Sequence, residues 1–165
     1  MTEEIFREDA TLLHCDAVVT GAGEGGVRLD RTVCYPLGGG QAGDTGWLVA
    51  GAHRWRITDT RKSKEHPGAI VHLLDGEPPA VGTRVRVEVD AARRQAHRRF
   101  HTATHLLCAL LPYPVDGCSI TEAYARLDFH TDQPFDKDAL QAGLARLVAE
   151  AHPVSHRWIS EDELD

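Results

Sequence analysis

Two histidines stand four residues apart in RRFHTATHLL, at residues 98–107. If this segment is helical, the imidazoles of His101 and His105 project from one face about one turn apart. Imidazoles placed in this way can bind one Zn²⁺ ion. The motif differs from HExxH because Thr102 stands where that motif has its glutamate, so no general base is supplied locally. The alternative is a pair of partly buried histidines with ordinary hydrogen-bond partners.

A protein zinc site needs at least three protein ligands, and two cysteines are candidates for the third. Cys108 follows His101 by seven residues and shares its helical face. It also lies within the apolar run LLCALL, where a cysteine packs as a small hydrophobic side chain. Cys118, in VDGCSI, has less geometric support, so the third ligand stays open.

A glycine-rich segment, YPLGGGQAGDTG, occupies residues 35–46. Consecutive glycines between β-type segments are typical of a tight turn or of a close approach by the backbone to another group. No GK[ST] follows, so the segment is not a phosphate-binding P-loop. A plain hairpin and a functional loop both fit this pattern.

Basic residues are concentrated just before the histidine pair: Arg93, Arg94, His97, Arg98 and Arg99. They form either a solvated charged face or a surface for RNA phosphates. The net charge of −7, with histidine neutral, weighs against nonspecific nucleic-acid binding. Residues 132–165 carry eight acids and three bases, however, which account for five of the seven excess negative charges. A local basic patch therefore remains compatible with the rest of the chain.

The first ninety residues predict short strands at 12–20, 26–33, 46–58, 69–75 and 83–89. Turns rich in glycine and proline separate these runs, which is typical of a small antiparallel barrel. In the last run, valines alternate with charged residues as they do in a half-buried strand.

At Asp90 the period becomes helical, with Asp90 as N-cap and no breaker until Pro112. A core stripe is predicted at Phe100, Ala103, Leu107 and Leu110. PYPVDG is predicted as a connector, residues 120–129 as a strand, residues 136–151 as an amphipathic helix, and VSHRWI as the start of another strand. The second helix is predicted to place Leu140, Leu144, Leu147 and Val148 on one face. The predicted class is α+β, with residues 1–90 as the barrel domain and residues 91–165 as a second unit.

The composition, 42% apolar and 26% charged residues, indicates a globular protein. No apolar run approaches the roughly 18 residues that cross a membrane. The acidic start MTEEIFREDA does not read as a secretory signal. The four cysteines show no CxxC pairing, which favours reduced thiols and a cytoplasmic protein.

The chain resembles the alanyl-tRNA editing proteins in the order and spacing of its motifs. These are YPLGGGQAGDTG, about fifty residues of β character and then RRFHTATHLL. The editing proteins form the AlaX-type trans-editing family, related to the editing domains of alanyl- and threonyl-tRNA synthetases. VDGCSITEAYARLDF is similar to that family's next block, and the resemblance runs from about Tyr35 to His156.

The resemblance implies a barrel of the translation-protein type followed by an α/β editing domain, of which residues 91–165 would be the N-terminal part. It also implies zinc-dependent hydrolysis of mischarged tRNA(Ala), mainly seryl and then glycyl, with the tRNA acceptor end as partner. No obligate protein partner is indicated. His101 and His105 correspond to the first two zinc ligands. The glycine-rich motif, Gly38, Gly39, Gly40 and Gln41, would lie near the substrate.

Further substrate-binding candidates are hydroxyl side chains that could hydrogen-bond a serine hydroxyl. They are Thr102, Thr104, Ser119 and Thr121, and the tRNA-binding candidates are Arg94, Arg98 and Arg99. The chain departs from the family in one respect, since the CxxxH that holds the remaining zinc ligands is absent from the sequence. We expect those ligands beyond Asp165, in a longer protein, and the alternative is a natural short form that lacks half of its metal site. The alternative hypotheses are an inactive tRNA- or partner-binding module and an unrelated metallohydrolase that completes its site with Cys108 or a carboxylate.

Overall fold

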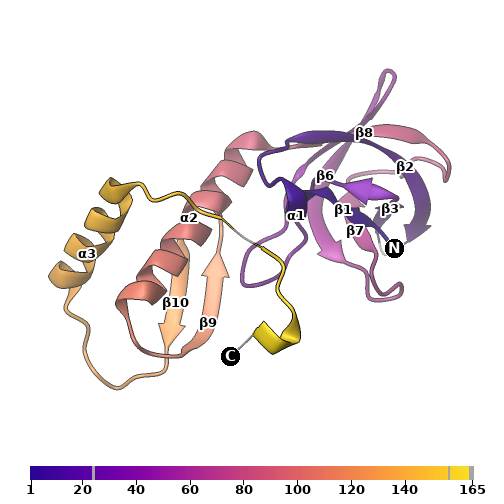
Figure 1. Cartoon of the computed structure of the whole chain (residues 1–165). Coiled ribbons are helices and arrows are strands. Elements are labelled where there is room, and N and C mark those ends of the chain that lie inside the picture. Colours follow the sequence, from indigo (N-terminus) through magenta and orange to yellow (C-terminus); the bar gives the residue numbers. More distant parts are fainter. Residues whose placement is uncertain (24, 156, 164–165) are drawn as a thin grey trace.

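The computed structural model describes residues 1–23, 25–155 and 157–163. Its first half is a closed antiparallel barrel in the order β2-β3-β7-β6-β5-β8 (Figure 1). The strands are β2 (His14–Gly23), β3 (Gly26–Leu29), β5 (Gly46–Ala50), β6 (His53–Lys62), β7 (Ile70–Leu74) and β8 (Arg84–Val89). The predicted barrel is thus confirmed.

Alternation of side chains explains how the barrel forms. In β8, Val85, Val87 and Val89 are buried while Arg84 and Arg86 are exposed, as the pattern predicted. Inward side chains from the other barrel strands complete one apolar core. Closure leaves no barrel strand with an unpaired edge.

Two predicted strands are divided in the structure. Residues 46–58 form β5 and β6 rather than one strand, because the chain reverses at Gly51, whose φ is +58°. Residues 26–33 form β3 and a short β4 (Arg31–Thr32), which pairs in parallel with β1 (Glu3–Glu4). A short helix that the sequence did not predict, α1 (Ile5–Glu8), follows β1.

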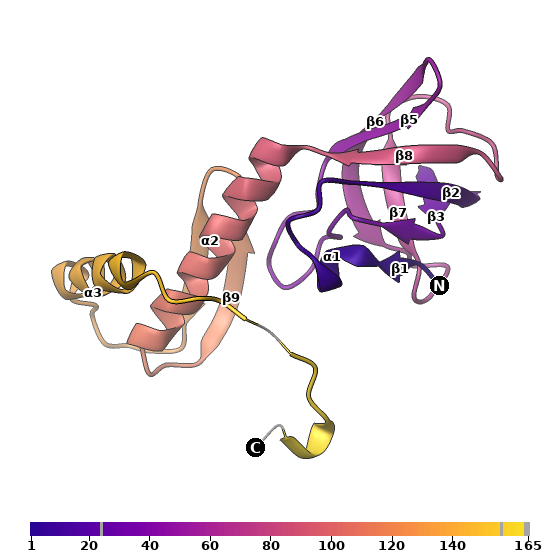
Figure 2. The same ribbon diagram turned by 45° about the horizontal axis from the view of Figure 1, so that its top comes forward.

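The second half begins with α2 (Ala91–Leu110), which runs from the barrel along the hairpin of β9 (Val115–Ile120) and β10 (Ala125–Phe129) (Figure 2). Asp90 is the N-cap, as predicted, and its carboxylate accepts a hydrogen bond of 3.1 Å from the Arg93 amide. The predictions of a connector at 112–117 and a single strand at 120–129 are wrong. The chain is already extended from Val115, and it turns at Thr121, whose hydroxyl accepts a 3.1 Å hydrogen bond from the Tyr124 amide.

The second amphipathic helix is present as α3 (Lys137–Glu150), which packs on α2 (Figure 1). Leu140, Leu144 and Leu147 are half-buried, whereas Val148 is exposed. The predicted α2 stripe is also only half-buried. The buried residues of α2 are instead Arg94, His97 and Thr104, and the first two lie against the buried Asp44.

The predicted strand in VSHRWI is not found at residues 154, 155 or 157–159, and His156 lies outside the described residues. The described residues of this segment have no regular structure before a short 3₁₀ helix, η1 (Glu161–Glu163). No helix in the described part of the chain is long and apolar enough to cross a membrane.

Candidate active site

The histidine pair stands on the face of α2 that borders a cavity of about 770 Å³. The rings of His101 and His105 are stacked, with centroids 5.1 Å apart and an interplanar angle of 11°. His101 is half-buried and His105 is exposed. The helical spacing therefore places both imidazoles at the same opening, as expected for residues one turn apart.

His101 is held by the glycine-rich segment. Its Nδ1 lies 2.8 Å from Oε1 of Gln41, a side chain that is 4% exposed. An amide oxygen only accepts, so the ring donates from Nδ1 and, when neutral, keeps the lone pair of Nε2 available. Burial, and then the neighbouring charge of His105, lower the pKa of His101, which favours this neutral form.

The three glycines build the turn that presents Gln41. Gly38 and Gln41 exchange backbone hydrogen bonds of 3.1 and 3.0 Å across the turn, and Gly40 has a φ of +76°. A Cβ on Gly40 would lie 2.8 Å from Sγ of Cys118 in β9. The segment is thus a tight turn packed against β9. Gln41 lines the cavity, whereas Gly38, Gly39 and Gly40 are outside its lining.

Arg94 joins the glycine-rich segment to α2 inside the protein. Its guanidinium pairs with the carboxylate of Asp44, and the two side chains are 3% and 0% exposed. It also donates to the carbonyls of Ala10 and Val33. These buried partners occupy its donors, so in this structure Arg94 has a structural role at the cavity wall, and its contact with tRNA stays a prediction. His97 is buried beside this pair, and burial lowers its pKa.

The next two arginines are both exposed, and neither forms an ion pair with a described residue. Arg98 lines the cavity one turn before His101 and Thr102, whereas Arg99 lies outside the lining. The tRNA-binding prediction is untested for both residues. Only Arg98 is placed where it could contact a ligand in this cavity.

The predicted hydroxyl candidates are not brought together. Thr102 is exposed and lines the cavity beside the histidines. Thr104 is buried, and its hydroxyl donates to the His101 carbonyl at 2.7 Å, so it serves the helix itself. Ser119 lies within β9 and Thr121 caps the hairpin turn, and neither lines the cavity.

The sequence did not predict several of the residues that form the cavity wall. The N-terminal segment from Phe6 to Thr11 and Tyr35 form one side, and Val154, Arg157 and Trp158 contribute from the C-terminal segment. No local pattern in the first eleven residues signals this role. The Ala10 carbonyl reaches the site through its hydrogen bond with Arg94, a contact between residues 84 positions apart.

Within the described residues, no group of three or more histidine, cysteine, aspartate or glutamate side chains is arranged to hold a metal ion. Cys108 and Cys118 therefore do not complete a site with the histidines. Both are free thiols, and burial raises the pKa of Cys118. The donors present fit half of a zinc site: two imidazoles, one of them oriented by a hydrogen bond from its other nitrogen, as zinc-ligating histidines are.

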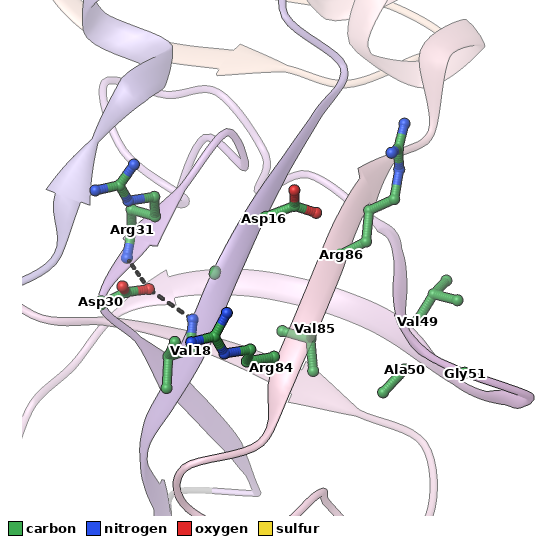
Figure 3. A pocket seen from close by; sticks show the side chains of 11 residues that line it. Asp16, Val18, Asp30, Arg31, Val49, Ala50, Gly51, Arg84, Val85 and Arg86 are labelled. Carbon is green, nitrogen blue, oxygen red and sulfur yellow. Dashed lines mark hydrogen bonds between the residues drawn. The ribbon is translucent and has the colours of Figure 1, made fainter.

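A smaller cavity of about 440 Å³ lies on the barrel, between β2, β8 and the β5–β6 turn (Figure 3). Two carboxylates, Asp16 and Asp30, line it, and Asp30 accepts hydrogen bonds of 2.7 and 2.9 Å from the Val18 and Arg31 amides. Its lining includes no histidine, cysteine or hydroxyl side chain. The histidine cavity is therefore the better candidate for chemistry.

Comparison with known proteins gives one consistent relationship. Residues 8–93 match the family model of tRNA synthetases class II (A). The chain is 30% identical to alanine–tRNA ligase of Archaeoglobus fulgidus over 99% of its length, which covers 19% of the ligase. Identity is 34% with the ligase of Thermofilum pendens (99% of this chain, 19% of the ligase) and 35% with that of Ignicoccus hospitalis (85% and 16%). The chain thus spans less than a fifth of the length of these curated relatives.

Proposed function

Because the chain belongs to the alanyl-tRNA synthetase family, the class II (A) tRNA synthetases, we propose that it is a trans-editing hydrolase that deacylates mischarged tRNA(Ala). Its main substrate would be seryl-tRNA(Ala), followed by glycyl-tRNA(Ala). The observation that carries this proposal is the hydrogen bond between His101 and Gln41. It joins two motifs 60 residues apart at one cavity wall, and these are the motifs on which the resemblance to editing proteins rests.

We further propose that His101 and His105 hold one Zn²⁺ ion through their ring nitrogens. The lowered pKa of His101 supports this role, because only a neutral imidazole donates its lone pair to a metal. The chemistry that bound Zn²⁺ supplies is polarisation of a carbonyl oxygen or activation of a water molecule. Zinc requires more than two ligands, so the remaining ligands would come from another stretch of polypeptide or from water molecules.

The bond to be broken joins the amino acid to the terminal ribose of the tRNA. A water oxygen bonds to the ester carbonyl carbon, the bond from that carbon to the ribose oxygen breaks, and the ribose oxygen receives a proton. In this arrangement Gln41 fixes the ring of His101, and the cavity holds the ester beside the histidine face of α2. Such positioning of reactants lowers the activation barrier.

Thr102 is the residue that we assign to selection of serine. Its side chain lines the cavity next to His101 and is not engaged in a hydrogen bond with a described residue. A hydroxyl placed to bond the serine hydroxyl leaves an alanyl substrate without that partner. Sites of this kind reject the shorter substrate better than an apolar slot rejects the longer one.

A second candidate function is a tRNA- or partner-binding module without catalysis. The observation that favours it is the absence of a third metal-binding side chain beside the histidines in the described part of the chain. The two functions share the same cavity, and they differ only in whether the ester is hydrolysed.

The test is release of labelled amino acid from seryl-, glycyl- and alanyl-tRNA(Ala), with and without added Zn²⁺. We expect seryl release to exceed alanyl release and to fall at least about 100-fold in His101→Ala, which removes one of the two site imidazoles. The matched control is His130→Ala, an exposed histidine outside the cavity lining. Binding of tRNA(Ala) without hydrolysis under every metal condition would instead establish the binding module.

A further inference from the structure

The cavity beside the histidine pair is larger than a single amino acid requires. Its volume of about 770 Å³ falls within the range of roughly 300–1,000 Å³ that is usual for sites of drug-sized ligands. Beyond the histidine face, its wall contains aromatic and cationic side chains from distant parts of the chain. Their chemistry indicates what else the cavity binds.

Tyr35 is an ordered aromatic surface in this wall. The ring is half-buried and meets the ring of Phe6 edge-on, with centroids 5.4 Å apart and an interplanar angle of 71°. Phe6 also lines the cavity but is only 5% exposed, and its ring supports that of Tyr35. The Tyr35 amide donates to the buried Asp44 carboxylate at 2.7 Å. A ring held in this way loses little conformational entropy when a flat ligand stacks on it.

Arg98 is the cation that this wall leaves available. Of the other lining arginines, Arg7 is paired with Glu4. Arg94 is paired with Asp44 and Arg157 with Glu163. Arg98 forms no ion pair with a described residue. Asp9 accepts hydrogen bonds from the amide and hydroxyl of Thr11, and these bonds are the main cause of its lowered pKa. The charge of Arg98 lowers the pKa of Asp9 to a smaller extent.

The order of these groups along α2 is suited to a nucleotide. Arg98 precedes Thr102 by four residues, or about 6 Å of helix, and His105 follows within another turn. A guanidinium binds phosphate oxygens in a forked geometry, and a tyrosine ring stacks on a base. Together they would hold both ends of a nucleotide whose ribose lies beside the histidines.

Building on the proposed function, we propose that Tyr35 and Arg98 form a subsite for the 3′-terminal nucleotide of an RNA strand. The terminal base stacks on the ring of Tyr35, and the phosphate on the 5′ side of that nucleotide binds Arg98. This placement directs the ribose, with its ester, toward Thr102 and the histidine pair. The subsite requires no metal ion and binds uncharged RNA as well.

The test measures binding of a short fluorescent single-stranded RNA that ends in CCA, by anisotropy with the full chain. Tyr35→Leu should weaken binding about 5- to 150-fold, the effect of losing one stacked base. The same RNA with an abasic 3′-terminal residue should bind Tyr35→Leu and the unmodified protein equally. Arg98→Gln should weaken both RNAs and reduce the slope of log K against log salt by about 0.7, as expected for one phosphate on a single strand.

The matched control is Arg99→Gln, which removes the same charge from an adjacent exposed position outside the cavity lining. It should leave the affinity and the salt slope unchanged. Tyr35→Phe keeps the ring against Phe6 and should bind as the unmodified protein does, which separates stacking from loss of fold. Equal losses in Arg98→Gln and Arg99→Gln, or the same Tyr35→Leu loss with the abasic RNA, would overturn the subsite.

Two further measurements separate this inference from the proposed function and from binding of a free nucleotide. If the protein hydrolyses seryl-tRNA(Ala) but Tyr35→Leu and Arg98→Gln bind RNA as the unmodified protein does, the subsite is overturned and the proposed hydrolase function is supported. If both variants bind RNA more weakly but the unmodified protein does not hydrolyse seryl-tRNA(Ala), the subsite is supported and the proposed hydrolase function is refuted. AMP should compete only at concentrations far above those of the RNA, and equal competition by AMP would overturn the assignment to an RNA terminus, as would failure of the RNA to bind.

Discussion

At the scale of single residues, Gln41 acts on the site through His101, whose ring it holds by a hydrogen bond. It accepts the Nδ1 proton of His101 at 2.8 Å and is almost wholly buried. A partner of this kind fixes both the tautomer and the ring orientation of a ligating histidine. Gln41 is therefore a positioning residue, and its removal should change the properties of His101 while leaving that residue in place.

We expect Gln41→Leu to reduce deacylation of seryl-tRNA(Ala) and affinity for Zn²⁺, each about 10- to 100-fold, the usual effect of losing such a partner. KM for the tRNA should change much less than kcat, because the RNA-binding wall is untouched. Gln133→Leu, at an exposed glutamine that bonds Asp132, is the control and should match the unmodified protein. Nitrogen NMR of His101 provides the independent readout. An unchanged tautomer in Gln41→Leu would refute the positioning role.

His72 gives the barrel a pH-dependent stability. It is fully buried in β7, its Nε2 lies 2.8 Å from Oγ1 of Thr32, and burial lowers its pKa from 6.5 to about 4. Between these values the unfolded chain binds a proton and the folded chain does not. The free energy of unfolding should therefore fall as pH drops from 6.5 to 4, by about 3 kcal/mol from this residue.

The measurement is denaturant unfolding at pH 7 and pH 5, compared between the unmodified protein and His72→Gln. The variant should lose about 2 kcal/mol less than the unmodified protein over this interval, because it lacks the titrating ring. The comparison uses the change with pH, so a uniform destabilisation by the substitution does not affect it. Parallel losses in the two proteins would mean that His72 does not titrate in this way.

At the scale of elements, the glycine-rich turn is fitted against β9. The Ile120 amide donates to the Gly40 carbonyl at 2.8 Å, and the Ala42 amide donates to the Ile120 carbonyl at 3.0 Å. This contact sets the position of Gln41 relative to α2. It also requires glycine at position 40, where a Cβ would lie 2.7 Å from the Cys118 carbonyl oxygen.

Gly40→Ala and Gly51→Ala separate this close approach from backbone strain. Both glycines have positive φ, +76° and +58°, but a Cβ on Gly51 would meet nothing within 4 Å. We expect Gly51→Ala to cost about 1–2 kcal/mol of unfolding free energy from the left-handed backbone alone. Gly40→Ala should cost about 1–3 kcal/mol more, because β9 must move. Equal costs in denaturant unfolding would show that the turn is not tightly packed on β9.

The elements that the sequence predicted well are those whose pattern is local. Alternating valines predicted β8, and an N-cap followed by an unbroken helical period predicted α2. The hairpin of β9 and β10 was missed because its turn is closed by the Thr121 hydroxyl rather than by glycine. The β5–β6 turn was missed because one glycine in an apolar run is a weak signal.

The site divides in the same way. The stacking of His101 and His105 at one opening follows from helical spacing, and the structure places them as that spacing predicts. The burial of Arg94 did not follow, because it depends on Asp44, which is 50 residues away. A run of arginines gives no indication of which member points inward. Tyr35 and the N-terminal wall reach the cavity through contacts that only the folded chain brings together.

At the scale of the whole molecule, burial is unevenly distributed between the two halves. The fully buried apolar side chains are concentrated in and around the closed barrel, whereas α3 contains no buried residue. The hairpin of β9 and β10 is a two-stranded sheet, which has little independent stability. Local opening costs least where few apolar contacts are lost, so α3 should open well before the barrel does.

Hydrogen exchange followed by mass spectrometry at increasing denaturant measures this difference. Amides of β6 and β7 should exchange only through global unfolding, with a steep dependence on denaturant. Amides of α3 should exchange at a much lower free energy with little dependence, because the opening exposes little surface. The α2 segment around His101 should be as protected from exchange as the barrel, because Arg94 and His101 hydrogen-bond to the buried side chains of Asp44 and Gln41. If α3 is as protected as β6, the halves unfold together, and the histidine face is stabilised by the whole chain rather than by the barrel alone.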